Sequence, residues 1–282
     1  MNYTINVRGQ LMDLSVPRVM GILNVTPDSF YAASRQQTEA AIAGRAEQLV
    51  AEGADIIDVG ACSTRPGSTP VAEDEEMNRL RLALGVVRRT VPEAVVSVDT
   101  FRPDVARMAV EELGADIIND VGGGHPMFRM VARLRVPYIL MSRAATVPTM
   151  LMELAGDVAQ LRSLGQKDII IDPGFGFGKT LEENFDVLRD MAQLQQLELP
   201  LLVGVSRKSM IYRTLQTQPE QALGGTTVLH TLALERGASI LRVHDVKEAA
   251  DCVRLLAAAG LVGAHGAAAV PQRTGPEGRV SN

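Results

Sequence analysis

The sequence predicts an α/β fold, a (β/α)8 TIM barrel, from three repeating features. Eight short apolar runs recur along the chain, and each ends on a polar or charged residue. A segment of helical length with an apolar stripe follows each run. Strands joined by helices run parallel with right-handed crossovers, and such barrels carry functional groups at the carboxyl ends of their strands. The runs end at Asn24, Asp58, Asp99, Asn119, Ser142, Asp172, Ser206 and Arg242.

The remaining elements fit one barrel domain over residues 1–262. Residues 3–18 alternate around Gly9 and predict a short N-terminal β-hairpin that plugs the bottom of the barrel. Helices are expected at 39–52, 72–90, 103–113, 126–135, 149–164, 181–196, 209–216, 222–236 and 246–260. Residues 263–282 are small, polar and rich in Pro and Gly, which predicts a disordered tail. A doubly wound open sheet is the competing architecture, but it usually has about five or six strands and a glycine fingerprint near its start.

Composition narrows the class of protein. The 282 residues suit a single barrel, which takes roughly 250 residues. A net charge of -5 argues against a general nucleic-acid or anionic-membrane binder, although a local basic site stays possible. The two cysteines, Cys62 and Cys252, cannot form a disulfide framework, and the N-terminus has no signal-peptide pattern. Because no apolar stretch reaches the ~18 residues that span a bilayer, we expect a cytoplasmic protein with no membrane partner.

Acidic and amide side chains end four of the predicted strands and are expected to line one pit. They are Asp58, Asp99, Asn119 and Asp172. Each of them alone is as readily a helix cap or a hydrogen-bonding partner as a ligand contact. Together they suit a heterocycle with N–H and amide-like edges, because carboxylates accept such protons and an amide both donates and accepts. No histidine belongs to this set, which argues against a dedicated metal cluster.

Cationic residues follow the last two predicted strands. Residues 206–209 read Ser-Arg-Lys-Ser, and residues 242–245 read Arg-Val-His-Asp. The corresponding loops of this fold commonly bind phosphate, and a helix that begins near Ser209 would offer free N–H groups to an anion. Ligand contact is therefore expected for Lys208, Arg242 and His244, and a surface salt bridge for Arg207. The other histidines are expected to be structural or inert: His125, His230 and His265.

The glycine-rich turn at residues 173–180 reads PGFGFGKT. It is not a P-loop, because Pro173 occupies the position of the first required glycine, and its G-x-G-x-G spacing is not that of a dinucleotide fingerprint. Such a turn lets the backbone and the ring of Phe177 approach a flat ligand. Two long loops, 24–37 and 58–70, follow the first strands and are expected to act as lids or substrate loops.

Seven segments, taken together, resemble the dihydropteroate synthases. They are Asn24–Phe30, Ser63–Gly67, Ser97–Thr100, Ile118–Asp120, Asp172–Lys179, Ser206–Met210 and Arg242–Asp245. The resemblance covers about residues 3–260. It implies a transferase of folate biosynthesis, the target of sulfonamides. Such an enzyme joins 6-hydroxymethyl-7,8-dihydropterin diphosphate to p-aminobenzoate, giving 7,8-dihydropteroate and pyrophosphate.

The resemblance also implies roles for the matched residues. Asn24 would help to hold Mg2+ with the pyrophosphate. The pterin would contact Asp99, Asn119, Asp172 and Lys208, and the diphosphate would contact Thr64, Arg242 and His244. The p-aminobenzoate would lie among Arg65, Pro66, Phe177, Lys208 and Ser209. Catalysis is expected to depend on Lys208, Arg242, His244 and Arg65. The family further implies a homodimer through the last helices, to which Met210, Ile211 and Tyr212 could contribute.

The chain departs from the family pattern in its first and fifth βα loops. Residues Ser142–Pro148 replace the usual Met-His-Met text, the segment from there to Asp172 is shorter, and Tyr31–Ser34 replace a Ser-Asp-Gly-Gly-like text. One alternative is therefore a pterin-binding protein of the same fold with reduced or lost turnover. Another is a barrel that passes a methyl group from a reduced folate to a corrinoid protein. The text of residues 64–66 and 206–209 argues against this last alternative.

Overall fold

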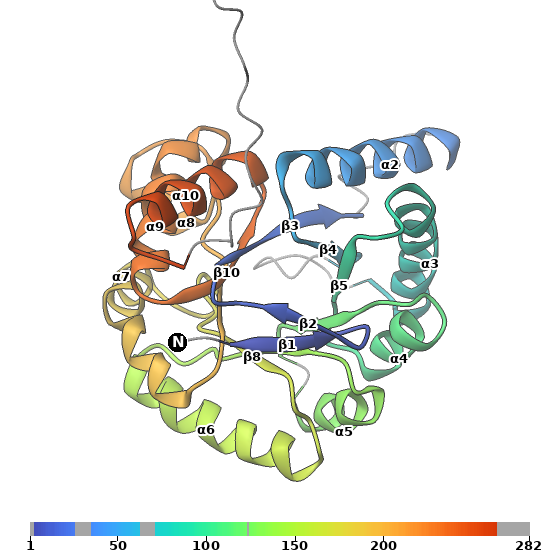
Figure 1. Cartoon of the computed structure of the whole chain (residues 1–282), viewed down its shortest axis with the longest axis horizontal. Coiled ribbons are helices and arrows are strands. Elements are labelled where there is room, and N and C mark those ends of the chain that lie inside the picture. Colours follow the sequence, from blue (N-terminus) through green and yellow to red (C-terminus); the bar gives the residue numbers. More distant parts are fainter. Residues whose placement is uncertain (1–2, 26–34, 63–70, 123, 264–282) are drawn as a thin grey trace, which may run out of the picture.

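The computed structural model describes residues 3–25, 35–62, 71–122 and 124–263, which form a closed parallel barrel (Figure 1). The strands follow one another around the ring in chain order, and β10 closes the ring against β3. The predicted (β/α)8 barrel is therefore confirmed. The strands are β3 (Arg18–Asn24), β4 (Ile56–Gly60), β5 (Val95–Asp99), β6 (Ile117–Asp120), β7 (Tyr138–Met141), β8 (Ile169–Asp172), β9 (Leu201–Val203) and β10 (Ala238–Val243).

Helices surround the ring of strands, as Figure 1 shows. They are α2 (Arg35–Glu52), α3 (Glu73–Thr90), α4 (Pro103–Glu111), α5 (His125–Leu134), α6 (Val147–Ser163), α7 (Leu181–Asp190), α8 (Ser209–Thr214), α9 (Leu223–Glu235) and α10 (Val246–Ala258). The helix expected at 181–196 is divided, because a 3-10 segment (Met191–Leu197) continues from α7. A further 3-10 turn, Pro219–Gln221, precedes α9. None of the helices within the described ranges is both long and apolar enough to cross a membrane.

The barrel interior changes from apolar to polar between one inward-facing layer of side chains and the next. Alternate strand residues face inward, and the lower inward layer is apolar, with Met20, Ile56, Ile117, Ile139, Ile170, Leu202 and Ile240 in one cluster. Two positions further along, five strands carry a polar residue on the same face. These residues are Asp58, Ser97, Asn119, Asp172 and Arg242. The candidate site therefore lies at the carboxyl ends of the strands.

Two strand ends differ from the predicted ones in ways that matter for the site. The strand that the sequence predicts to stop at Asp58 continues to Gly60 as β4, so Asp58 lies inside the ring and is 0% exposed. Asp120 belongs to the outward face of β6, where its carboxylate accepts a hydrogen bond from the Tyr138 hydroxyl. The side chain of Asp120 is thus directed to the helix layer, and Asn119 is the residue that faces the interior.

The N-terminal hairpin consists of β1 (Thr4–Val7) and β2 (Gln10–Asp13), which pair antiparallel. Figure 1 shows it lying across the end of the barrel. Ile5 and Val7 are buried in the same cluster as the lower apolar layer of the barrel. The expectation that the hairpin plugs the bottom of the barrel is therefore confirmed.

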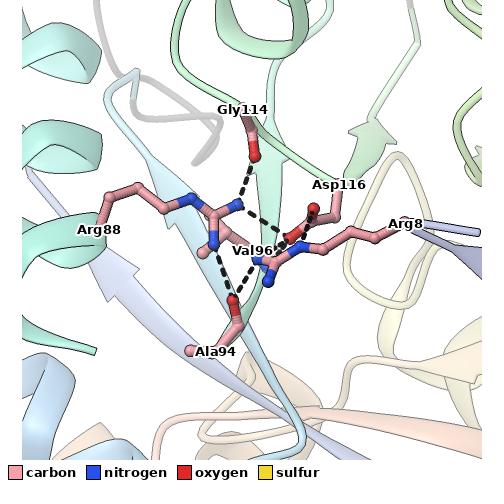
Figure 2. Close-up of polar contacts among 6 residues, drawn as sticks. All are labelled: Arg8, Arg88, Ala94, Val96, Gly114 and Asp116. Atoms are coloured by element: carbon pink, nitrogen blue, oxygen red, sulfur yellow. Dashed lines mark hydrogen bonds and ion pairs between the residues drawn. The ribbon is translucent and has the colours of Figure 1, made fainter. Parts of the chain in front are cut away.

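A clamp of two arginines around Asp116 holds this hairpin in place (Figure 2). Arg8 Nε donates to Asp116 Oδ1 at 2.6 Å, and Arg8 Nη2 donates to Oδ2 at 2.8 Å and to the Ala94 carbonyl oxygen at 2.7 Å. Arg88 Nη2 donates to Asp116 Oδ2 at 2.9 Å, and the Val96 N–H donates to the same atom at 2.8 Å. Burial alone would raise the pKa of Asp116, but these donors outweigh it and lower the pKa.

Replacing Asp116 with alanine is expected to lower the free energy of unfolding by about 2–3 kcal/mol, because it removes the buried partner of two arginines. Both guanidinium groups are partly exposed and can reach water, which limits the loss. A carboxyl group with a lowered pKa stabilises the fold above about pH 4 and loses this contribution in acid, so the deficit should shrink there. Urea denaturation at several pH values measures it, and a deficit that stays the same in acid would exclude the Asp116 carboxylate as its cause.

A cavity of about 500 Å3 lies beside this clamp. Its lining includes Asn6, Arg8, Asp116, Arg135 and Pro137. These residues belong to the hairpin and to loops that lead into strands, so the cavity lies at the amino-terminal end of the barrel. The polar inward layer, which is the candidate site, lies at the opposite, carboxyl end of the barrel.

Candidate active site

A connected group of four polar side chains occupies the carboxyl end of the barrel. Asn119 Nδ2 on β6 donates to Asp58 Oδ2 on β4 at 3.0 Å. Arg242 Nε on β10 donates to the same oxygen at 2.6 Å, and Arg242 Nη2 donates to Asp99 Oδ2 on β5 at 2.7 Å. One guanidinium therefore joins two carboxylates, and the group ties together four strands of the ring.

Burial governs the charges in this group. It raises the pKa of Asp99 to about 7, although Arg242 opposes the shift. For Arg242, burial alone would lower the pKa, but Asp58 and Asp99 outweigh it and raise the pKa. At this end of the barrel, three buried side-chain atoms have no hydrogen-bond partner within the described residues: Oδ1 of Asp58, Oδ1 of Asp99 and Oγ of Ser97. Unpartnered carboxylate oxygens suit a ligand that brings N–H donors.

Lys208 and Asp172 form the second pair of opposite charges. Lys208 Nζ donates to the Phe175 carbonyl oxygen and lies 4.9 Å from the centroid of the Phe177 ring. Burial lowers the pKa of Lys208 to about 8, while Asp172 acts in the opposite direction. Burial also raises the pKa of Asp172, while Lys208 opposes the rise. Lys208 thus lies under the ring of Phe177, which the sequence predicts to contact a flat ligand.

Glycine is required at two positions of the turn after β8. Gly174 has a φ of +65°, its N–H donates to Asp172 Oδ1 at 2.7 Å, and a Cβ there would lie 2.2 Å from the Ser142 carbonyl oxygen. Gly176 has a φ of +78°, and a Cβ there would lie 3.1 Å from Lys208 Cδ. The missing side chains therefore let this turn pack closely against the loop after β7 and against Lys208.

The loops after β9 and β10 meet through Ser206 and His244. Ser206 Oγ lies 3.0 Å from His244 Nδ1 and accepts the His244 backbone N–H at 3.2 Å. Arg45 Nη2 on α2 donates to the His244 carbonyl oxygen at 2.7 Å. Arg207 pairs with Asp245 through bonds of 2.9 and 2.6 Å, so the salt bridge expected for Arg207 is present. These contacts fix the backbone and ring of His244 beside the site.

Asn24 ends β3 next to Gly60, the last residue of β4. A Cβ at Gly60 would lie 3.2 Å from Asn24 Oδ1 and 3.6 Å from Asp99 Cβ, so the glycine gives both side chains room. Within the described ranges, no group of three or more His, Cys, Asp or Glu side chains could hold a metal ion. An amide oxygen does fit Mg2+, which commonly uses one or two protein oxygens and completes its shell with substrate phosphates and water.

The structure places most of the predicted site residues at one end of the barrel. Those on strands are Asn24, Asp99, Asn119, Asp172 and Arg242, and those in the following loops or at the start of α8 are Phe177, Lys208, Ser209 and His244. Thr64, Arg65 and Pro66 lie outside the described residues. Asp99, expected to contact the pterin, and Arg242, expected to contact the diphosphate, are hydrogen-bonded to each other. The acidic and cationic sets therefore meet in the centre.

One buried acidic residue near the site was missed by sequence reasoning. Glu76 on α3 is 0% exposed, and its Oε1 accepts from the Thr100 hydroxyl at 2.7 Å. Its other oxygen pairs with Arg102. Because Thr100 follows Asp99 directly, Glu76 supports the end of β5 from outside the ring. Its sequence context, four consecutive acidic residues at a helix start, is typical of an exposed first turn and gave no signal of burial.

Comparison with known proteins identifies the family. A family model described as "Pterin binding enzyme" matches residues 20–244. The dihydropteroate synthase of Escherichia coli (strain K12) is 37% identical over 268 residues, which is 89% of this chain and 94% of that protein. The chain belongs to the dihydropteroate synthase family.

Solved dihydropteroate synthases have the same fold. The Xanthomonas albilineans dihydropteroate synthase with 4-aminobenzoic acid superposes with a TM-score of 0.86 at 37% identity, covering 93% of this chain and 100% of that chain. The complex of the enzyme from the same organism with 7,8-dihydropteroate gives a TM-score of 0.83 at 36% identity, covering 92% and 100%. The family resemblance seen in the sequence therefore extends to the whole barrel.

The fifth βα loop, which departs from the text usual in dihydropteroate synthases, is packed against its neighbours. Ser142 Oγ donates to Glu153 Oε2 on α6 at 3.1 Å and accepts from the Ala144 N–H at 3.1 Å. Arg143 Nη2 donates to the Val121 carbonyl oxygen after β6 at 2.8 Å. The buried stripe of α6 also covers the barrel as expected. The altered loop is thus joined to the elements on either side.

Proposed function

We propose that this chain condenses 6-hydroxymethyl-7,8-dihydropterin diphosphate with p-aminobenzoate, giving 7,8-dihydropteroate and pyrophosphate. The observation that carries the proposal is the hydrogen-bonded group of Asp58, Asp99, Asn119 and Arg242. It combines acceptors for a nitrogen heterocycle with a cation for a phosphate group. The Xanthomonas complexes with 4-aminobenzoic acid and with 7,8-dihydropteroate support the same substrate and product for this chain.

The pterin ring would bind in the pit through its N–H and amino groups. Asp99 has an unpartnered oxygen there, and both Asp99 and Asp172 have a raised pKa because they are buried. Donors from the ligand would replace the lost hydration and favour the ionised carboxylates. Asn119 has its Nδ2 on Asp58, so its Oδ1 is the atom that would accept from the ring.

Departure of the pyrophosphate would depend on the cations of the site, one of which, Arg242, is bonded to the acidic set. Arg242 and His244, with Thr64, would stabilise the charge that develops on the leaving oxygen. Mg2+ bound at Asn24 together with the diphosphate would supply further positive charge. As the C–O bond breaks, its electron pair leaves with the diphosphate and the pterin methylene carbon becomes electron-deficient. The carboxylates of Asp99 and Asp172 favour that carbon electrostatically, so no enzyme nucleophile is required.

The p-aminobenzoate would then attack the methylene carbon through its amine nitrogen, which loses a proton. Lys208 and the Phe177 ring, which lie next to each other, would contact the aromatic ring of p-aminobenzoate. Ser209, the first residue of α8, would place backbone N–H groups near its carboxylate. Arg65 and Pro66 of loop two would help to frame the same substrate. Exclusion of water is essential, because water would otherwise capture the same carbon.

The proposal is tested by assaying pteroate formation and pyrophosphate release with both substrates and with each one omitted. Both products are expected only when both substrates are present. Pyrophosphate release with the pterin diphosphate alone would indicate hydrolysis instead. Tight pterin binding with no product over hours would favour the alternative of a binding protein that lost turnover through its altered fifth loop. An absorbance assay with a methylated folate and a corrinoid protein tests the methyl-transfer alternative.

Affinity for the pterin is expected to fall as the pH drops below about 7. Burial gives Asp99 a pKa of about 7 in the empty site, so in acid its carboxyl is neutral and must lose a proton before it accepts ligand N–H groups. The loss should approach about tenfold per pH unit below the pKa. Isothermal titration calorimetry of a pterin analogue from about pH 5.5 to 8.5 measures it. Asp99→Asn should bind weakly and without this dependence, and an equal slope in both proteins would exclude Asp99 as the titrating group.

We further propose a cytoplasmic homodimer. Met210 and Ile211 are 1% and 3% exposed, so the idea that they contribute to a subunit contact does not hold. Val228 on α9 and Leu255 on α10 are 58% and 71% exposed, and these helices are neighbours in Figure 1. Sedimentation velocity should give a dimer that Val228→Glu with Leu255→Glu converts to a monomer. Neither Cys62 nor Cys252 forms a disulfide bond within the described residues, which suits a reducing compartment.

A further inference from the structure

Asp58 contacts two residues of the proposed site, although the family resemblance implies no role for Asp58 itself. The side chain lies in the middle of β4 and is 0% exposed. A single oxygen, Oδ2, accepts from Asn119 Nδ2 at 3.0 Å and from Arg242 Nε at 2.6 Å. One of these partners belongs to the proposed pterin contacts and the other to the proposed diphosphate contacts. A single oxygen of Asp58 therefore connects a proposed pterin contact, Asn119, with a proposed diphosphate contact, Arg242.

Direct contact of Asp58 with substrate is disfavoured by its surroundings. The carboxylate has no surface accessible to solvent, while Arg242 and Asp99 above it keep some exposure. Its neighbour across the β4–β5 pairing is Ser97, whose Oγ is also buried. A ligand that enters from the carboxyl end therefore meets Asn119, Asp99 and Arg242 before Asp58. Oδ1 of Asp58 has no partner among the described residues, but Oδ2 can act on a ligand only through Asn119 and Arg242.

The two hydrogen bonds determine which atoms Asn119 and Arg242 offer to a ligand. An amide beside a carboxylate must direct its NH2 group toward it, because the reverse orientation would place two oxygens together. Asp58 thus leaves Asn119 Oδ1 as an acceptor for ring N–H groups. By holding Nε, Asp58 also fixes the plane of the guanidinium, which keeps Arg242 in the pit when a ligand competes for Asp99.

We propose that Asp58 is a positioning residue, which holds the Asn119 amide and the Arg242 guanidinium in the orientation that the pterin and diphosphate require. The inference rests on the proposed function and deepens it. It differs from a purely structural role, which would affect stability without selecting between ligands. Because p-aminobenzoate contacts neither of the two partners, its binding should be independent of Asp58.

The test compares Asp58→Asn with the wild type in direct binding and in turnover. Isothermal titration calorimetry with a pterin analogue and with pyrophosphate is expected to show Kd values that rise at least about tenfold for each ligand. The KM for p-aminobenzoate should stay within about twofold while kcat falls. Asp55→Asn is the matched control, because Asp55 directly precedes β4 but pairs with Arg18 at its other end. This control should change neither Kd.

A double-mutant cycle separates positioning from an independent effect. In an Asn119→Ala background, Asp58→Asn should weaken pterin binding by less than about twofold, because the side chain through which it acts is gone. An undiminished effect in that background, or unchanged Kd values in the single variant, would overturn the proposal. Asp58→Ser, with room for a water molecule, serves if Asp58→Asn does not fold, and the same pattern is expected. A wild-type protein that binds neither ligand would instead overturn the proposed function.

Discussion

Arg242→Met is expected to abolish measurable turnover and to lower the free energy of unfolding by about 3–5 kcal/mol near neutral pH. The guanidinium is the cation for both Asp58 and Asp99, at 2.6 and 2.7 Å. Methionine has a similar length and no charge, so it leaves two buried carboxylates without their partner. It also removes a cation proposed to receive the departing pyrophosphate, a loss of about a thousandfold or more in rate.

The pH dependence of this destabilisation is what identifies its cause. Without Arg242 the pKa of Asp99, which burial already raises, rises further. A group with a raised pKa stabilises the fold only at low pH and loses that contribution as the pH increases. Guanidinium denaturation should therefore show a smaller deficit at about pH 5.5 than at about pH 8. Arg18→Met is the matched control, because Arg18 is 18% exposed, Arg242 is 20% exposed, and each pairs with an aspartate. A control that loses as much activity would refute the assignment.

Lys208→Met is expected to lower kcat/KM by about a hundredfold while changing the free energy of unfolding by less than about 1 kcal/mol. Burial lowers the pKa of Lys208 to about 8, so its charged form is disfavoured in the folded protein. A lysine with a lowered pKa contributes stability only at high pH and loses it as the pH falls through about 8, so methionine removes a cost at neutral pH. Asp172 loses its cation but already has a raised pKa and can take up a proton.

Activity and stability should thus separate in this variant, in contrast to Arg242→Met. Steady-state kinetics with each substrate varied, combined with thermal denaturation, measures both quantities. Lys247→Met on α10 is the control, since Lys247 is 67% exposed and pairs only with Asp251 at the surface. A large loss of stability with normal kinetics would show that Lys208 supports the glycine-rich turn and does not contact substrate.

The fold could be predicted from the sequence because most of the strands are apolar runs that end on a polar residue. Apolar β-branched runs such as Ile169–Ile171 and polar residues such as Asp172 mark where a buried strand stops. Helix periodicity then predicts eight alternating strands and helices, a number that favours the observed barrel over a doubly wound open sheet. The bounds that failed involved Asp58 and the segment 191–197, where the chain carries no turn residue that would mark the change.

The members of the site were easier to predict than their connections. Residues at strand ends must share one face of a barrel, which brought Asp99, Asn119 and Arg242 together without any structure. Nothing in a linear pattern tells which carboxylate an arginine selects, so the pairing of Arg242 with Asp99 was not expected. Glu76 shows the same limit, because its burial results from the packing of α3 against the end of β5.

Closure of the ring by β10 against β3 has a consequence for the order in which the molecule can be completed during synthesis. The hairpin is synthesised before the barrel strands, but the Asp116 carboxylate that binds Arg8 of the hairpin follows 108 residues after Arg8. The first barrel strand, β3, obtains its second hydrogen-bonded neighbour still later, when β10 (Ala238–Val243) has been synthesised. Until then β3 has an unpaired edge, which is a template for association with other chains. We expect nascent chains that stop short of β10 to depend on chaperones, however well their first seven strands are formed.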